Sequence, residues 1–288
     1  MRAVATFSIL ARDPASGALG IATASRFLAV GAVVPHAVAG VGAIATQSFA
    51  NTSYGPRMLQ ALRAGVPLSL VHRAFEETDA QHASRQYGMV DADGHTLTFT
   101  GDACHPWAGG RTGQDYAAQG NLLAGPEVIA DLADTFEATS GALPERLMAA
   151  LRAGDAAGGD SRGRQAAALL VVRAGGGYGG LDDRYVDLRV DDDPDPVGRL
   201  TELLTLQRLY FGAPDPDDVA PIEGEVAERA LQVLRAHGRL PPDHERWDDR
   251  AEQALRDLAG VLNLEERMVA PGRVDLQALA HMERVAPA

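Results

Sequence analysis

The chain has 288 residues, of which 46% are hydrophobic, and a formal net charge of -13. This length and composition suffice for a sizeable core in one or two domains, and no window approaches the roughly 18 to 20 apolar residues of a membrane helix. The acidic charge, without any basic cluster, argues against nucleic acid and anionic membrane as partners. We expect a cytoplasmic protein, because the start MRAVATF lacks the features of a signal peptide.

The residue types that are missing exclude several chemistries. There is no lysine, so all 26 basic side chains are arginine. A Schiff-base lysine, a P-loop lysine and a lysine general base are therefore excluded. Cys104 is the only cysteine, which rules out an intramolecular disulfide and a cysteine-based zinc site. We expect no cofactor and no resident metal.

The first 50 residues predict four short strands before any helix. Residues 6–12 alternate in polarity, and the turn residues at 13–17 join them to a second strand that ends at 24–26. Two more β-rich segments are predicted at 30–34 and 41–47, separated by Gly and Pro. Four strands are therefore expected to open the fold, the first two of them paired.

Helices and strands then occur in separate runs. Segment 101–121 is rich in glycine and polar residues, and we predict a loop that lines a site. The other predicted elements, in chain order, are helices at 58–66 and 68–75, strands at 86–91 and 96–100, helices at 128–136 and 143–151, strands at 167–173 and 185–193, and a helix at 197–204. Such segregated runs indicate an α+β fold.

The predicted architecture is a four-layer αββα sandwich over residues 1–212. Residues 213–223 are rich in Pro and Asp and are predicted to form a linker. A small all-α domain should follow over 224–288, with helices at 224–237, 248–262 and 275–285.

Several motifs carry a resemblance to a known family. TFSILARDP, GIATASRFLAVGAVVP, GVGAIATQ, AQGNLLAGPEV, AAGGDSRGRQ and VDLRVDDDPDPV resemble the DUF1028 family of bacterial and archaeal proteins, over about the first 210 residues. That family is similar to N-terminal-nucleophile (Ntn) hydrolases, which implies an αββα fold and hydrolysis of a small amide or peptide-like substrate. The tail LRDLAGVLNLEERMVAPGRVDLQALAHM resembles a peptidoglycan-binding domain that often follows this family.

Thr6 matches the position of an Ntn nucleophile at the start of the first strand. In this chemistry the hydroxyl attacks a carbonyl, and the α-amine of the same residue accepts the proton. The amine has an ordinary pKa of about 8, so it works as a base close to neutral pH. It becomes free only if the bond between Ala5 and Thr6 is cleaved. The alternative is a threonine that only stabilises its strand.

Ser25 and Arg26 end the second predicted strand. Proteasome subunits place an aspartate before such a Ser-Arg pair, whereas this chain has Ala24. We therefore interpret Ser25 as a catalytic candidate and Arg26 as a clamp for a substrate carboxylate, or else as a structural ion-pair partner. Gln47 and Asn51 are candidate substrate-binding donors, with helix capping as the alternative for Asn51.

Two later segments supply further candidates. Gln119 and Asn121 precede a predicted helix, so they could bind substrate and stabilise an oxyanion, or simply form a capping turn. In the loop 158–162, Asp160 could orient an amine and Arg162 could bind substrate, or both could be solvated loop residues. The sequence leaves both alternatives open in each segment.

Metal and thiol chemistry are weaker interpretations. The acidic run 191–195 lacks the spacing of a calcium loop, and helix capping explains it more simply. Metal-dependent hydrolysis through Asp160 and this run is a third hypothesis. Cys104 next to His105 resembles a thiol and a base, but sequence neighbours rarely face each other.

The leading functional hypothesis is an Ntn-type hydrolase, and the alternative is a non-catalytic ligand-binding or assembly protein. The expected partners are a small-molecule substrate and a second copy of the chain in a homodimer. Peptidoglycan is disfavoured, because Trp247 is the only Phe, Tyr or Trp after residue 223 and sugars bind by stacking on aromatic rings.

Overall fold

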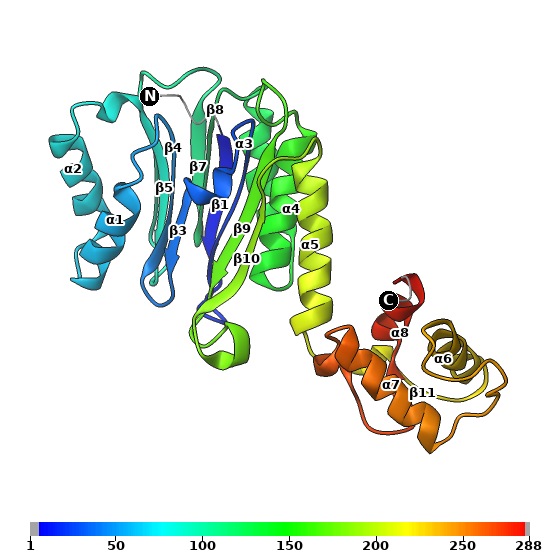
Figure 1. Cartoon of the computed structure of the whole chain (residues 1–288). Coiled ribbons are helices and arrows are strands. Elements are labelled where there is room, and N and C mark those ends of the chain that lie inside the picture. The colour runs from blue at the N-terminus through cyan, green and yellow to red at the C-terminus, as the bar shows by residue number, and fades with distance from the viewer. Residues whose placement is uncertain (1–5, 286–288) are drawn as a thin grey trace. The chain divides into compact units, whose positions relative to one another are not determined.

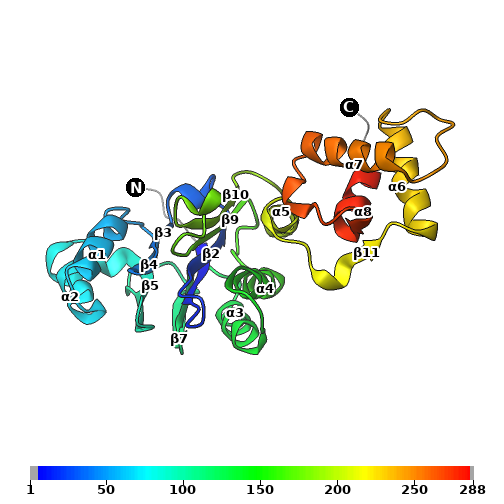
Figure 2. The ribbon, with the colours of Figure 1, turned by 90° about the horizontal axis from the view of Figure 1, so that it is seen from below.

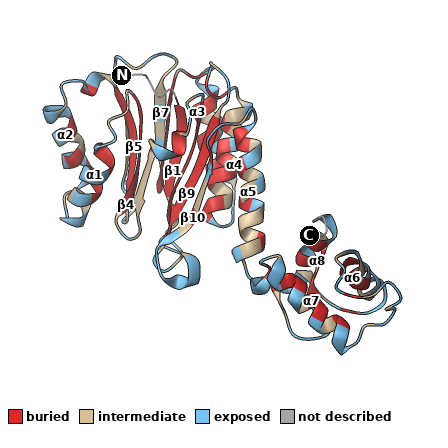
Figure 3. Cartoon of the chain, viewed as in Figure 1, coloured by how far each residue is buried: buried red, intermediate tan, exposed pale blue. Residues whose placement is uncertain are grey.

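Figure 1 shows a computed structural model of the chain, which describes residues 6–285. The chain folds into two compact units, Met1–Leu203 and Leu204–Ala288. The boundary lies within α5 (Pro196–Phe211), ahead of the segment 213–223 that the sequence predicts as a linker. Each unit has its own buried core (Figure 3).

A six-stranded antiparallel sheet forms the centre of the first unit. Its strand order is β10-β9-β2-β1-β8-β7, so β1 lies in the interior of the sheet. The register pairs Thr6 with Asn121 on one side of β1 and Phe7 with Ala24 on the other. The strands are β1 (Thr6–Arg12), β2 (Leu19–Ser25), β7 (Gly109–Gly113), β8 (Tyr116–Asn121), β9 (Ala166–Val172) and β10 (Arg184–Val190).

A second, four-stranded antiparallel sheet packs face to face against the first. Its order is β3-β4-β5-β6, with β3 (Pro35–Val38), β4 (Gly42–Ser48), β5 (Arg85–Asp91) and β6 (Thr96–Thr100). Apolar side chains from both sheets form the core between them, including Leu10, Ile21, Ala45 and Val90. Burial of this apolar surface is the main force that holds the sheets together.

Helix pairs cover the outer faces of the two sheets (Figures 1 and 2). α1 (Tyr54–Arg63) and α2 (Leu68–Thr78) pack on the four-stranded sheet, where Phe75 stacks on Tyr54. α3 (Glu127–Ala138) and α4 (Leu143–Ala156) pack on the six-stranded sheet. The first unit is therefore layered helix, sheet, sheet, helix.

Two local predictions are wrong. The sequence predicts a strand at 30–34, but this segment contains the short 3₁₀ helix η1 (Val30–Ala32), and β3 begins only at Pro35. The sequence also predicts a loop over 101–121, but this segment contains β7 and β8. Ala and Gly have low strand propensity, yet they suit β8, which is buried between neighbouring layers. A Cβ at Gly120 would lie 2.5 Å from the Leu123 side chain.

The second unit is mainly helical, but the prediction of an all-α domain is wrong in one respect, because β11 (Val219–Pro221) and β12 (Arg273–Asp275) form a short two-stranded ladder. Its helices are α6 (Gly224–Ala236), α7 (Asp249–Val261) and α8 (Leu276–Arg284). The buried Asp275 side chain accepts hydrogen bonds from two backbone N–H groups of the first turn of α8 and forms an ion pair with Arg267. Among the described residues, no helix has both the length and the apolar character needed to span a bilayer.

Candidate functional site

Polar side chains fill one end of the layer between the two sheets. This is the end where β1 and β5 begin and where β2, β4 and β8 finish. The residues concerned alternate along their strands, so their side chains share the inner face. Those without any exposed surface are Thr6, Ser8, Thr23, Gln47, Gln86, Gln119 and Asn121. Polar groups buried at this density need hydrogen-bond partners, because each unpaired one costs free energy.

Gln47 is the centre of this polar layer. Its side-chain Oε1 accepts a hydrogen bond from Ser8 Oγ at 2.6 Å. Its Nε2 donates to the Thr6 carbonyl oxygen at 3.0 Å and to Gln86 Oε1 at 2.9 Å. A longer contact of 3.3 Å reaches the Gln119 carbonyl oxygen. One side chain of the four-stranded sheet therefore holds the backbone of the two neighbouring strands β1 and β8.

Gln86 extends the same network to Asn121. Gln86 Nε2 donates to the carbonyl oxygen of Gly120 at 2.7 Å, and Gln86 Oε1 accepts from Asn121 Nδ2 at 2.9 Å. Asn121 is directly opposite Thr6 in the strand register. The amides of Gln47, Gln86 and Asn121 therefore form a continuous chain that ends beside the first residue of β1.

Some acceptors and donors in this layer stay unused. Within residues 6–285, the buried Gln119 Nε2 and Oε1 and the buried Asn121 Oδ1 have no hydrogen-bond partner. The Gln119 side chain lies against Gly88, where a Cβ would come within 2.0 Å of Oε1. A buried polar group without a partner costs about 1 to 3 kcal/mol. Such groups are candidates for contact with a substrate.

The backbone next to these amides is strained. Ser48 and Leu122, which directly follow Gln47 and Asn121, have φ angles of 64° and 54°. For residues other than glycine this left-handed conformation costs on the order of 1 to 3 kcal/mol and tends to occur at functional sites. The strain therefore coincides with the polar end of the sandwich.

Asp160 joins the end of β2 to the loop before β9. Its carboxylate accepts from the backbone N–H of Arg26 at 2.9 Å and pairs with the Arg162 guanidinium at 2.7 and 3.0 Å. The Arg26 guanidinium in turn donates to the Arg162 carbonyl oxygen. Leu122 also contacts this loop, because its carbonyl oxygen accepts from Ser161 N at 2.9 Å. The loop thus covers the end of the sandwich at which Thr6 lies.

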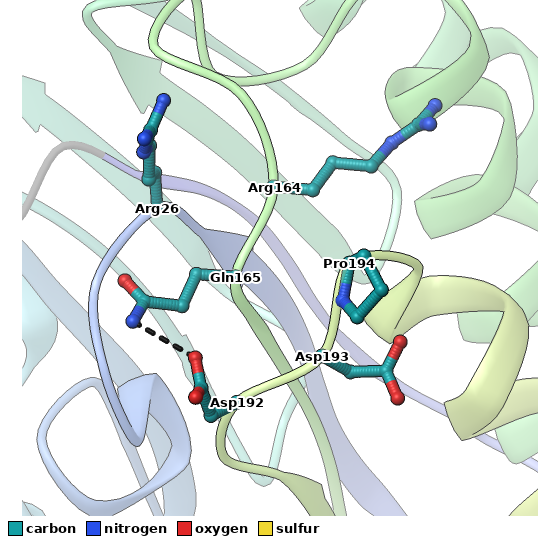
Figure 4. Close-up of a pocket in the computed structure, with 6 residues that line it drawn as sticks. All are labelled: Arg26, Arg164, Gln165, Asp192, Asp193 and Pro194. Atoms are coloured by element: carbon teal, nitrogen blue, oxygen red, sulfur yellow. Dashed lines mark hydrogen bonds between the residues drawn. The ribbon is translucent and has the colours of Figure 1, made fainter.

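An open pocket of about 340 Å³ lies beside this loop (Figure 4). Its lining residues come from the end of β2, the segment before β9 and the segment after β10. They are Arg26, Arg164, Gln165, Asp192, Asp193 and Pro194. Gln165 N donates to the carbonyl oxygen of Ser25 at 3.2 Å. The pocket is therefore next to the strand end that carries Ser25.

The structure brings most of the predicted site residues to this one end. Thr6 begins β1, and the register that pairs Phe7 with Ala24 puts the 2% exposed Ser25 on the strand beside it. The other residues gathered here are Arg26, Gln47, Gln119, Asn121, Asp160 and Arg162. The predicted cleavage between Ala5 and Thr6 involves Ala5, which lies outside the described part of the chain.

The alternative of a capping turn for Gln119 and Asn121 is wrong. Both residues lie within β8, paired with Ser8 and Thr6 of β1. The inner face of β8 packs against the four-stranded sheet, so these side chains point into the layer between the sheets instead of capping a helix.

Asn51 lies in a different network. Its Nδ2 donates to Asp79 Oδ2 at 3.0 Å, and its Oδ1 accepts from the Ser53 backbone N–H at 3.2 Å, just before α1. Asp79 is also bound by Arg85 and Tyr54, and the hydrogen bond from the Arg85 guanidinium lowers the pKa of the Asp79 carboxyl. The N-cap of α1 is Ser53, so the capping alternative for Asn51 is wrong as well; its side chain forms a turn just before the helix, and we leave Asn51 out of the candidate site.

The structure gives little support to the hypotheses of thiol and metal chemistry. Burial raises the pKa of the Cys104 thiol, which disfavours the reactive thiolate. Asp160 is engaged by Arg162 and by backbone N–H groups. Within residues 6–285, the one group of side chains that could converge on a metal ion is Asp91, Asp93 and His95 in an exposed turn, apart from both Asp160 and the run 191–195.

Sequence reasoning missed several residues of this end. Ser8, Thr23 and Gln86 belong to the buried network, and Arg164 and Gln165 line the pocket. The signal that was present is polar alternation within otherwise apolar strands, as in Thr6 with Ser8 and Gln119 with Asn121. Buried strands usually carry apolar side chains on the inner face, so such alternation marks a polar interior.

Comparisons with known proteins agree with the division of the chain into two units. Residues 6–200 match a family described as "Family of unknown function (DUF1028)", and residues 210–282 match one described as "Putative peptidoglycan binding domain". A crystal structure of a Silicibacter pomeroyi protein with the same DUF1028 assignment is similar, with 30% sequence identity and a TM-score of 0.64. The similarity covers 77% of this chain and 92% of that one. Among curated proteins, none matches the chain.

Proposed function

The chain belongs to the DUF1028 family, and we propose that it is an Ntn-type hydrolase of a small amide or peptide-like substrate, with Thr6 as the nucleophile. The observation that carries this proposal is the position of Thr6. It is the first described residue of the interior strand β1, opposite Asn121, at the end of the sandwich where buried amides from both sheets converge. The helix-sheet-sheet-helix layering, similar to that of Ntn hydrolases, gives further support.

The proposed reaction begins with cleavage of the bond between Ala5 and Thr6, which frees the Thr6 α-amine. The Thr6 hydroxyl oxygen then attacks the substrate carbonyl carbon while the α-amine takes the hydroxyl proton. Collapse of the tetrahedral intermediate expels the substrate amine, which receives that proton from the α-ammonium group. Water then hydrolyses the ester on Thr6 by the same proton transfers in reverse.

Neighbouring groups are suited to hold the reacting residue. Gln47 fixes the Thr6 peptide group through its carbonyl oxygen, and Ser8 fixes the Gln47 amide. Asn121 Oδ1 has no partner among the described residues, so it offers an acceptor to the freed amine. Prepositioning of this kind lowers the entropic part of an activation barrier. Gln47 and Asn121 therefore act as positioning residues in the proposal.

The decisive experiment combines mass spectrometry with amide hydrolysis. The full-length chain buries Thr6 completely, so we expect the intact protein to be inactive and a form starting at Thr6 to hydrolyse chromogenic amides or dipeptides. Thr6→Ala should abolish turnover, and Thr98→Ala on β6 serves as the matched control. Undiminished amidase activity of the intact chain, or of Thr6→Ala, would overturn the proposal.

Ligand binding without hydrolysis is the second candidate function. The specific observation in its favour is that Thr6 is fully buried whereas an open pocket near the same end is lined by Arg26 and Arg164. A protein of this kind would bind small molecules with no release of products. Ligand-induced stabilisation without turnover in any form of the chain would support it.

For the second unit we propose self-association instead of sugar binding. It matches a family described by peptidoglycan binding, but the pocket between α6 and α8 is lined by Arg229, Val233, His237 and Met282 and by no Phe, Tyr or Trp side chain among the described residues. Sedimentation with isolated sacculi and analytical ultracentrifugation separate the two roles. We expect a dimer and no co-sedimentation, whereas binding to sacculi would show that this unit recognises the cell wall.

A further inference from the structure

The pocket beside the Asp160 loop has walls of opposite charge. Arg26 follows β2 and Arg164 precedes β9, whereas Asp192 and Asp193 follow β10. Figure 4 shows Arg26 and Arg164 in the upper part of the view and the two aspartates in the lower part, with the Asp192 carboxylate next to the Gln165 amide. With a volume of about 340 Å³, the pocket lies at the small end of the range for ligand sites.

The two arginines differ in how far their charge is neutralised. Arg164 Nε lies 2.8 Å from Asp155 Oδ1, so this guanidinium has a carboxylate partner. Within the described chain, the side chain of Arg26 donates only to the neutral carbonyl oxygen of Arg162. Arg26 therefore presents a positive charge to the pocket that no described carboxylate neutralises, with guanidinium N–H groups to spare.

The two carboxylates have only neutral partners. Asp192 Oδ1 accepts from the Gln165 side-chain amide at 3.0 Å, and Asp193 Oδ1 accepts from the backbone N–H of Asp195 at 2.7 Å. Neither aspartate forms a salt bridge with any residue between 6 and 285. The hydrogen bond from Gln165 holds Asp192 in place (Figure 4). Among the described residues, Arg26 and the aspartates thus lack charged partners although they line one small cavity.

We propose that this pocket binds a small zwitterion that carries both a carboxylate and an ammonium group, such as an α-amino acid or a dipeptide. The planar guanidinium of Arg26 would bind the carboxylate in a bidentate manner. Asp192, with Asp193 beside it, would bind the ammonium group. A simple anion is disfavoured by the two carboxylates, and a simple cation is disfavoured by Arg26. Only a ligand with both charges matches both walls.

This proposal also names a compound class for the hydrolase. Ser25 precedes Arg26 and lies on the strand next to Thr6, so a bound zwitterion would lie near the polar end of the sandwich. An amide with a free α-amine and a free carboxylate, or an amino acid released from it, is therefore the expected substrate or product. The assignment of the zwitterion as substrate or product rests on the proposed hydrolase function, whereas the binding of a zwitterion in the pocket does not.

Calorimetric titration of the full-length protein at low salt tests the proposal with four probes. L-alanine and L-alanyl-L-alanine carry both charges, N-acetyl-alanine carries only the carboxylate, and alaninamide carries only the ammonium group. We expect measurable binding of alanine or the dipeptide, and affinities at least about tenfold weaker for both blocked analogues. Equal affinity for a blocked analogue, or no binding of any probe, would overturn the proposal.

Charge-neutralising variants locate the site. Arg26→Gln should weaken binding of the dipeptide about tenfold or more, and so should Asp192→Asn, with unchanged melting temperatures because both side chains are exposed. Arg184→Gln and Asp134→Asn are matched controls, since these residues are exposed and lie outside the pocket. Unaltered binding by Arg26→Gln would refute the assignment. Thr6→Ala should bind the dipeptide normally, so a failure of hydrolysis remains distinguishable from a failure of binding.

Discussion

The side-chain amide of Gln47, on β4, donates a 3.0 Å hydrogen bond to the carbonyl oxygen of Thr6, on β1. The bond crosses from one sheet to the other and fixes the peptide group that follows the proposed nucleophile. Ser8 determines the orientation of the amide, because its hydroxyl donates to Gln47 Oε1. A single buried glutamine therefore connects the stability of the sandwich to the geometry of the candidate site.

Gln47→Leu should destabilise the protein strongly. The variant leaves the Thr6 carbonyl oxygen and Gln86 Oε1 without the donor that Gln47 supplies, whereas the Ser8 hydroxyl keeps its hydrogen bond to Thr23. We expect the free energy of unfolding to fall by about 2 to 4 kcal/mol, since each orphaned buried group costs about 1 to 3 kcal/mol. Urea denaturation measures the change. A loss below about 1 kcal/mol would mean that the network contributes little.

Gln119→Met should have the opposite effect on stability. In the described part of the chain both polar atoms of the Gln119 side chain are buried without a partner, so a thioether of similar shape removes a desolvation cost. We expect the free energy of unfolding, measured in the same denaturation experiment, to rise by about 1 kcal/mol. If Gln119 binds substrate, the more stable variant should also turn over or bind substrate less well. A destabilised variant would show that Gln119 has a structural role.

Asp160→Ala should loosen the loop that closes the candidate site. The Asp160 carboxylate accepts from the Arg26 and Arg162 backbone N–H groups and pairs with the Arg162 guanidinium. We expect a loss of about 1 to 3 kcal/mol and faster proteolysis of the loop. Asp134→Ala removes the exposed partner of Arg111 and should cost less than about 1 kcal/mol. Equal effects of the two substitutions would contradict the assignment.

Arg267→Met should destabilise the second unit. Arg267 is 4% exposed and its Nε lies 2.6 Å from the fully buried Asp275 carboxylate, which would lose its counter-charge. Removal of one partner from a buried ion pair costs about 3 to 5 kcal/mol. Arg229→Met is the control, because the Arg229–Glu283 pair is partly exposed and should contribute about 1 kcal/mol or less. Thermal unfolding of both variants distinguishes these magnitudes.

His82 should contribute to acid sensitivity. Burial lowers the pKa of its imidazole below the ordinary 6.5, and the charged or titratable groups that act on it are His72, Glu76, Asp79 and Arg85. The unfolded chain then binds a proton more readily, so stability is full above about pH 6.5 and falls as the pH drops toward the lowered pKa. His82→Gln should reduce the loss of unfolding free energy when the pH is lowered from neutral to about 5, as measured by urea denaturation.

His95 provides a control of opposite sign for the pH experiment. Its hydrogen bond to Asp91 raises the pKa of the exposed imidazole, so its contribution to stability is present below about pH 6.5 and is lost as the pH rises through the raised pKa. His95→Gln should therefore increase the loss on acidification. The same direction of change in both variants would contradict the assigned shifts.

Element positions could largely be predicted from the sequence. Periodicity located α1 to α4 and the hairpin of β5 and β6, because one buried face imposes a helical or alternating pattern. The prediction failed at β7 and β8, where Gly and Ala replace the β-branched residues that usually mark strands. In these strands only small side chains fit between the closely packed layers, and this packing requirement outweighs the low intrinsic strand propensity of Gly and Ala.

The candidate site could be predicted only as separate residues. Motif resemblance named Thr6, Ser25, Asn121 and Asp160, and the fold brings them to one end of the sandwich. The motifs could not place Asn51 in the Asp79 network or reveal that Gln86 connects Gln47 to Asn121. These contacts join strands far apart in the chain, so no local pattern encodes them.

The sequence by itself determined the chemical inventory of this protein: no lysine, one cysteine, an acidic balance and strands with polar residues on alternate positions. Only the tertiary structure decided which of these groups meet. The reason is physical, since hydrogen bonding and charge compensation depend on distances of about 3 Å between side chains, and those distances are set by strand order and sheet packing. The amide chain beside Thr6, and the arginines and aspartates that line one pocket, are brought together at that level.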